Sequence, residues 1–120
     1  MEQAGGKTTA VLCADSSDEE QVIELFKKAG SDISLASYSA GNNFPGQIIE
    51  MDAAYFENSW QSCCFGGFLF GRKALLYMVP NSKGTILFTG ASAYLGGRPN
   101  FGALNSAKAG LSTLAQAMAK

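Results

Sequence analysis

The sequence predicts an α/β fold with about three parallel strands and three helices. Short β-branched or apolar runs occupy residues 8–13, 33–38 and 85–89. Stretches with apolar residues at helical spacing lie between or after these runs, over residues 18–29, 53–79 and 102–119. Because strands that alternate with helices pair in parallel and are covered by the helices, we expect one sheet with helices packed on it.

Length and composition limit the class of protein. The 120 residues have the length of one domain, so we expect residues 1–120 to form a single unit with one core. The chain is 47% apolar and contains no histidine, which excludes histidine-based catalysis and His-ligated metal sites. We therefore predict no metal site. Its 3 cysteines include no C-x-x-C pair, which favours a reducing, cytoplasmic location.

Charge is distributed unevenly along the chain. All 10 acidic residues lie within residues 1–57, whereas residues 58–120 carry only basic charges. These basic residues are scattered and form neither a run nor a stripe interleaved with aromatic residues. The sequence therefore predicts no nucleic-acid partner.

The first half of the chain has the order strand, helix, strand. After the run at residues 8–13, the segment from Ser17 to Glu20 has the S/T-x-x-E pattern of a capping box and predicts the start of a helix. Gly30 is the expected stop of that helix. The run at residues 33–38 is the second predicted strand, and residues 39–52 form a loop rich in Gly, Asn and Pro.

The second half begins with a long predicted helix over residues 53–79. Residues 62–80 are nearly apolar, which raises the alternative of a membrane span. Arg72 and Lys73 stand at the centre of this stretch, where each would cost about 2.5–3.5 kcal/mol in a bilayer. A buried helix is therefore favoured, and no membrane partner is expected.

The third predicted strand, residues 85–89, leads into a glycine-containing segment with two interpretations. One is a dinucleotide-binding turn, in which glycines let the backbone approach a pyrophosphate. The central glycine of such a turn would fall at Tyr94, and no acidic residue follows Glu57 to bind a ribose. This interpretation stays open as the weaker one.

The other interpretation rests on a resemblance that extends over nearly the whole chain. The strand followed by "TGASAYLGGRPNF" and "LNSAKAG" resembles the active-site segment of the short-chain dehydrogenase/reductase family. "GGKTTAVLCADSSDEEQVIELFKKA" is similar to the family's third strand and the helix after it. "YSAGNN" resembles its Asn-Ala-Gly turn, and "WQSCCFGGFLFGRKAL" resembles the helix that carries its catalytic asparagine. The resemblance implies a partial Rossmann-like, three-layer fold.

The resemblance also implies a cofactor, NAD or NADP, and the residues that would bind it. Asp15 stands at the place of the aspartate that meets the adenine. The other implied cofactor-binding residues are Ser39, Ala40 and Gly41 of the turn, together with Lys108. Ser39 replaces the first asparagine of that turn.

The family's catalytic residues are mostly replaced here. In the family, a tyrosine transfers the proton, a lysine four residues later lowers its pKa, a serine positions the carbonyl and an asparagine supports a water relay. Lys108 is the only one retained, because Leu104, Ala91 and Cys63 stand at the other positions. An aliphatic side chain cannot transfer a proton, and Lys108 is equally open to interpretation as a surface lysine on an apolar helix.

Three functions remain open. The first is an incomplete, catalytically degenerate member of the family, without the first strand-helix-strand cofactor unit and the last strands. The second is a piece of a functional NAD(P)-dependent oxidoreductase that segments outside this chain complete. The third is an interaction module that uses its apolar helices.

Two expectations about assembly follow. The helices over residues 53–79 and 102–119 correspond to the pair that usually forms the family's dimer interface, so a homo-oligomer is expected; the apolar residues on the second are Leu104, Leu111, Leu114 and Met118. If the chain folds alone, residues 8–13 are expected to pair directly with residues 33–38 through a right-handed crossover, or to stay loosely attached.

Overall fold

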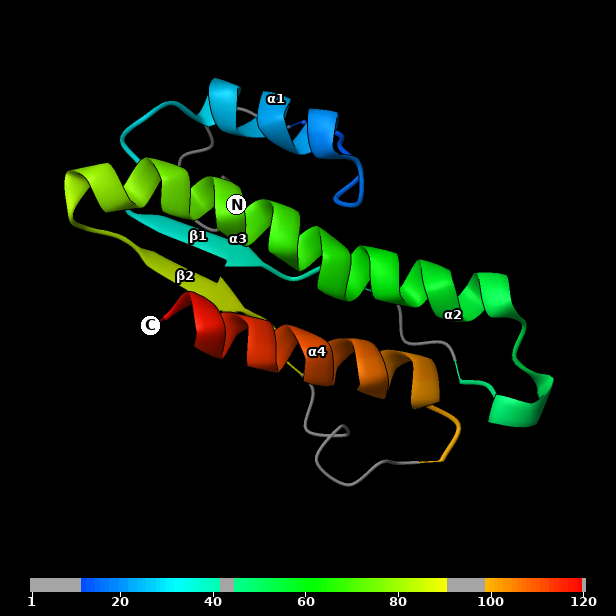
Figure 1. Ribbon diagram of the computed structural model, residues 1–120. Helices are drawn as coiled ribbons and strands as arrows, with labels where there is room; N and C mark the ends of the chain where they lie inside the picture. Colours follow the sequence, from blue (N-terminus) through cyan, green and yellow to red (C-terminus); the bar gives the residue numbers. More distant parts are fainter. Residues whose placement is uncertain (1–11, 42–44, 91–98, 120) are drawn as a thin grey trace, which may run out of the picture.

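A computed structural model describes residues 12–41, 45–90 and 99–119 of the chain. Its helices lie beside a short parallel sheet (Figure 1). The elements in chain order are α1 (Glu19–Ala29), β1 (Leu35–Tyr38), the 3₁₀ turn η2 (Ile48–Glu50), α2 (Ala53–Trp60), the π turn η3 (Gln61–Phe65), α3 (Gly66–Met78), the 3₁₀ turn η4 (Val79–Asn81), β2 (Thr85–Phe88) and α4 (Gly102–Met118).

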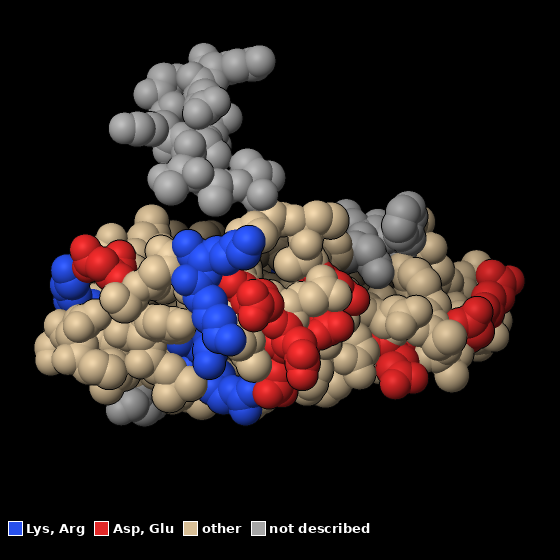
Figure 2. Space-filling view, turned by 90° about the horizontal axis from the view of Figure 1, so that it is seen from above, with Lys and Arg blue, Asp and Glu red and all other residues tan. Residues whose placement is uncertain are grey.

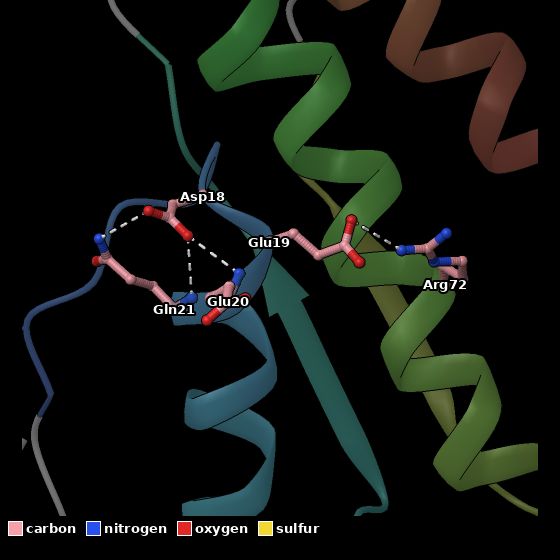
Figure 3. A network of polar contacts seen from close by, with 5 residues as sticks. All are labelled: Asp18, Glu19, Glu20, Gln21 and Arg72. Carbon is pink, nitrogen blue, oxygen red and sulfur yellow. Dashed lines mark hydrogen bonds and ion pairs between the residues drawn. The ribbon is translucent and has the colours of Figure 1, made fainter.

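Helix α1 begins one residue later than the capping-box pattern predicts. Asp18 is the N-cap, and its carboxylate accepts hydrogen bonds from the backbone N–H groups of Glu20 and Gln21 at 3.0 and 3.2 Å (Figure 3). The expectation that Ser17 caps the helix is wrong, because a carboxylate accepts these bonds more strongly than a hydroxyl. Gly30 ends the helix as predicted, with φ at +91°.

The strands β1 and β2 pair in parallel, with Leu35 opposite Thr85 and Tyr38 opposite Phe88. Parallel pairing confirms the predicted α/β class. The first predicted strand, residues 8–13, lies largely outside the described residues; Leu12 and Cys13, at its end, are described and are not in a strand. Whether residues 8–11 pair with β1 therefore stays a prediction.

The helices pack on one face of this two-stranded sheet. Ala36 of β1 lies in the same buried cluster as Phe26 of α1 and Leu69 of α3, and Ile86 of β2 packs against that cluster. The opposite face of the sheet carries Leu35 and Leu87, which are 59% and 52% exposed. The described residues thus supply the sheet and one of the two helical layers of a three-layer fold.

The long predicted helix over residues 53–79 is present but is not uniform. A π turn, η3, joins α2 to α3, and the N–H of Gly66 donates to the carbonyl of Gln61, five residues earlier. Sequence periodicity does not distinguish such a turn from an ordinary helical turn, since it adds only one residue to the pattern.

Glycine contacts show how closely the helices approach one another and the sheet. A Cβ at Gly67 of α3 would overlap the side chain of Leu111 of α4. A Cβ at Gly71 would lie 2.6 Å from Met118 of α4 and 3.0 Å from Phe88 of β2. The absence of side chains at these positions of α3 therefore permits the contact with α4.

The surface has mixed charge where α1 packs beside α3. Figure 2, seen from above, shows a band of Lys and Arg side chains beside a band of Asp and Glu side chains. Arg72 of α3 lies 3.5 Å from Glu19 of α1, and both side chains are about half exposed (Figure 3). Such a pair contributes at most about 1 kcal/mol. Within the described part of the chain, every helix is too short or too polar to cross a membrane.

Candidate functional site

Several of the residues singled out from the sequence meet where β1 and β2 end. In open parallel sheets, ligands bind outside the carboxyl ends of the strands. Here β1 continues into Ser39, Ala40 and Gly41, β2 continues into Thr89, and side chains of α4 and of the π turn η3 donate to backbone carbonyls of these segments. This region is therefore the candidate site.

Lys108 of α4 lies in the interior of this region. It is only 6% exposed, and its ammonium donates to the backbone carbonyl of Thr89 at 2.8 Å and to that of Ala40 at 3.4 Å. These carbonyls follow β2 and β1, respectively. A buried ammonium has to be compensated by acceptors, and the two strand ends supply them. Lys108 therefore links the two strand ends and is not a surface charge.

Cys63 of the π turn is the second member of the site. Its side chain is 1% exposed, and its thiol donates to the same Ala40 carbonyl at 3.4 Å. Burial raises the pKa of the Cys63 thiol, while the nearby Lys108 ammonium acts in the opposite direction. Because burial is the larger effect, the thiol stays protonated at neutral pH and is a poor nucleophile.

Gly41, which follows β1, packs against the side chains of Cys63 and Lys108. Its φ of +147° lies in the region that favours glycine, and an added Cβ would lie 2.5 Å from the sulfur of Cys63 and 3.9 Å from the Lys108 ammonium. The backbone at Gly41 therefore comes close to both side chains. Ala40 and Gly41, identified from the turn motif, do lie beside Lys108.

The structure places the remaining predicted site residues less centrally. Leu104 is half-buried on α4, one turn before Lys108, while Ala91 lies outside the described residues, as do Ser92 and Tyr94. Ser39 is exposed immediately after β1.

Asp15 is exposed on the segment that leads into α1. Its carboxylate accepts from the hydroxyl of Ser17 at 2.7 Å and from the N–H of the same residue at 2.9 Å. These hydrogen bonds lower the pKa of Asp15. The carboxylate is therefore ionised at neutral pH.

Two residues of the site escaped the sequence reasoning. Thr89 contributes only its backbone carbonyl, which no side-chain motif can reveal. Tyr38, 4% exposed at the end of β1, donates from its hydroxyl to the carbonyl of Ser62 in the π turn and lies 3.1 Å from the hydroxyl of Ser16. Its position directly before the Ser39-Ala40-Gly41 turn is the signal that would have drawn attention to it.

Metal chemistry has no visible support at this site. Within the described ranges, no cluster of three or more Cys, Asp or Glu side chains is arranged to hold a metal ion. The site instead combines one cation, one neutral thiol and backbone carbonyls.

Comparison with known proteins assigns this arrangement to a family. The family model for short chain dehydrogenases matches residues 1–120, which is the entire chain. The chain belongs to the short-chain dehydrogenase family. A search of curated proteins finds no match.

Solved structures of short-chain dehydrogenases agree in fold. A short-chain dehydrogenase from Rhodopseudomonas palustris is 34% identical, with a TM-score of 0.89 over 98% of this chain and 56% of its own. A protein assigned provisionally as a gluconate dehydrogenase, from Agrobacterium tumefaciens, is 26% identical, with a TM-score of 0.88 over 98% of this chain and 47% of its own.

A third structure, ElxO with NADP bound, is 23% identical, with a TM-score of 0.84 over 92% of this chain and 48% of its own. At this identity the likeness shows the fold alone. The chain thus spans about half the length of the short-chain dehydrogenase structures it matches.

Proposed function

We propose that this chain is a catalytically degenerate part of an NAD(P)-dependent short-chain dehydrogenase, which keeps the family's packing and its lysine but lacks the proton-transfer chemistry. The observation that carries the proposal is the environment of Lys108. Its ammonium donates to the carbonyls of Thr89 and Ala40, and the side chain one helical turn earlier is Leu104.

The chemistry of the family requires a phenol close to this cation. An unperturbed phenol has a pKa of about 10, so a neighbouring positive charge is needed before it can act as a base at neutral pH. Leu104 carries no ionisable group. Cys63 does not replace the phenol, because burial raises the pKa of its thiol and leaves it protonated.

The site retains some features that fit a dinucleotide. Lys108 could donate to a ribose hydroxyl in exchange for its longer bond of 3.4 Å to Ala40. The ionised Asp15 could accept a hydrogen bond from an amino group. When bound, NAD or NADP supplies the hydride acceptor or donor; the residues of this chain would hold and orient it.

Cofactor binding tests the proposal and separates it from its alternative, a functional enzyme that other segments complete. NADPH and NADH are titrated into the 120-residue chain while nicotinamide fluorescence is followed. We expect no saturation below about 1 mM, which corresponds to a binding free energy weaker than about −4 kcal/mol. Saturation in the micromolar range, lost in Lys108→Met, would contradict the proposal and favour the functional enzyme.

A second proposal, self-association, is supported by an exposed apolar row on the long helix. Phe56, Trp60, Phe68, Leu76 and Val79 are between 36% and 67% exposed, and a groove of about 510 Å³ runs between α3 and α4 beside the last three. Exposed apolar residues that form a continuous patch are typical of protein interfaces. We propose that a second copy of this chain packs there.

Sedimentation tests this second proposal. Leu76 and Val79 are changed to lysine together, and the mass of the parent and the variant is compared at several concentrations. We expect the parent to form a dimer and the variant to remain a monomer with unchanged helical content. Lysine at the exposed Ile49 is the matched control, since this residue lies in η2, away from the row. A monomeric parent would contradict the proposal.

The location is also a proposal. The three cysteines are all free thiols, with Cys13 exposed and Cys63 buried. Free thiols are typical of reducing compartments and support a cytoplasmic protein.

A further inference from the structure

The hydroxyl of Tyr38 joins segments that are far apart in the sequence. It donates to the carbonyl of Ser62 in the π turn η3, and it lies 3.1 Å from the hydroxyl of Ser16 in the segment before α1. A phenol has a single hydrogen, and a carbonyl can only accept. Tyr38 therefore donates to Ser62 and accepts from Ser16.

The hydroxyl of Tyr38 reaches the backbone of the π turn. Its hydrogen bonds run over five residues, as from the N–H of Gly66 to the carbonyl of Gln61. The wider turn displaces carbonyls from the ordinary helical ladder, and side chains that reach such carbonyls stabilise the irregularity. The carbonyl of Ser62 receives its bond from Tyr38.

The π turn determines which side chains face α4. Ser59, Cys63, Gly67 and Gly71 are all buried and follow one another at intervals of four residues. In an ideal α-helix, each such interval rotates the row by about 40°. A turn that takes more residues reduces this rotation, so the row keeps facing α4.

Successive residues of this row contact successive residues along α4. Cys63 and Lys108 both donate to the Ala40 carbonyl, Gly67 packs against Leu111, and Gly71 packs against Met118. If η3 relaxed to an α turn, Cys63 would rotate relative to Gly67 and lose its place against Lys108. The pairing at the site therefore depends on the π turn.

We propose that Tyr38 is a positioning residue: its hydroxyl holds the π turn and thereby keeps the Cys63 thiol against the Lys108 ammonium. This inference concerns the site of the proposed function, but it rests on the geometry of η3 and requires no bound cofactor. Its failure would leave the cofactor experiment above unaffected.

The ring of Tyr38 has a separate role that a test has to keep constant. It packs in the core with ring centroids 5.3 Å from Phe70 and 6.3 Å from Phe88. Phenylalanine at position 38 would retain these contacts and remove only the hydroxyl. Tyr38→Phe is therefore the variant that tests the proposal.

The measurement is the alkylation rate of Cys63 by iodoacetamide, followed by intact mass. Cys13→Ser and Cys64→Ala in every variant leave Cys63 as the single thiol. We expect Tyr38→Phe to react about tenfold faster than the parent, as loss of one hydrogen bond to a buried carbonyl predicts. Alkylation requires the π turn to open and expose Cys63. Because this opening is local and exposes little surface, the alkylation rate should change little with low concentrations of urea.

Two control variants separate positioning from general loss of stability. Tyr77→Phe removes a hydroxyl from a ring that stacks on Phe26 in the same core, and it should react like the parent. Val22→Ala weakens the buried cluster at α1, away from η3; its rate should rise only as its lower urea midpoint predicts, with a clear urea dependence.

Three results would overturn the proposal. One is a Cys63 rate in Tyr38→Phe equal to that of the parent. Another is a rate that rises with urea as it does in Val22→Ala. The third is a Tyr38→Phe variant that stays unfolded even in a stabilising osmolyte, trimethylamine oxide, in which the rates are measured if the variant is unfolded in buffer. That result would assign Tyr38 to overall stability.

Discussion

At the scale of single residues, the molecule buries a positive charge and stabilises it with hydrogen bonds to backbone carbonyls. Lys108 is 6% exposed, and the acceptors of its ammonium are the carbonyls of Thr89 and Ala40. These carbonyls are fixed by the pairing of β1 with β2. The ammonium therefore stabilises the sheet at the end where ligands of related folds bind, whether or not it takes part in a reaction.

Replacing this lysine tests its contribution to stability. Lys108→Met keeps most of the side-chain volume but removes the donor from two carbonyls. We expect the free energy of unfolding to fall by about 1–3 kcal/mol, measured by urea denaturation. Lys83→Met is the matched control, because the Lys83 ammonium pairs with Asp32 at the surface and should change stability by less than about 0.5 kcal/mol. Equal effects would contradict this role.

The titration of the thiol predicts an alkaline loss of stability. Burial raises the pKa of Cys63 above its ordinary 9.0, so above pH 9 the unfolded chain loses this proton before the folded chain does. The folded state then binds more protons, and stability falls as pH rises. We expect the urea midpoint to decrease between pH 8 and about pH 10, and to decrease less in Cys63→Ala. A midpoint that rises over this range would contradict the assignment.

Residue identity at the site was predictable only where a side chain carries the signal. Lys108, Cys63 and the Ala40-Gly41 turn were found from motif order, and the structure brings them together. Thr89 acts through its carbonyl, and the partner of the Tyr38 hydroxyl is a carbonyl in a different element. Backbone acceptors have no sequence signature, so these contacts required the structure.

At the scale of elements, the long helix illustrates what periodicity can and cannot predict. The apolar spacing over residues 53–79 predicts a helix, and α2, η3 and α3 together occupy this range. The π turn within it is invisible in the pattern, because one added residue shifts the apolar positions no more than ordinary scatter does. The cap of α1 was misplaced by one residue for a similar reason: Ser17 and Asp18 both suit the position.

Substitution of Gly66 tests how closely the start of α3 packs against Tyr38 of β1. A Cβ at Gly66 would overlap the hydroxyl of Tyr38 and lie 2.9 Å from the backbone carbonyl of Ser16. Because the backbone cannot yield as a flexible side chain does, we expect Gly66→Ala to lower the free energy of unfolding by about 1–3 kcal/mol. Gly46→Ala is the control, since its Cβ would meet only Met51, at 3.8 Å. A stability gain in Gly66→Ala, as helix propensity alone predicts, would contradict this packing.

At the scale of the whole molecule, the described residues cover only one face of the sheet. Leu35 and Leu87 lie on the other face and are 59% and 52% exposed. The structures that this chain matches are about twice as long. This face of the sheet therefore exposes apolar side chains that the described helices leave uncovered.

Substitution on this face tests that description. Leu35 and Leu87 are changed to threonine together, because threonine is β-branched and suits a strand. We expect the free energy of unfolding of the 120-residue chain, measured with urea, to stay within about 0.5 kcal/mol of the parent, because little apolar area is lost from the core. We also expect less light scattering on concentration. A loss above about 2 kcal/mol would show that the face is covered in solution.

The most direct test of the central claim is turnover. Oxidation of NADPH is followed with a panel of ketones and aldehydes, using the 120-residue chain and Lys108→Met. We predict that both proteins give only the background rate, since Leu104 stands where the family has its proton-transferring tyrosine and the Cys63 thiol stays protonated. Turnover by the parent chain that Lys108→Met abolishes would contradict it.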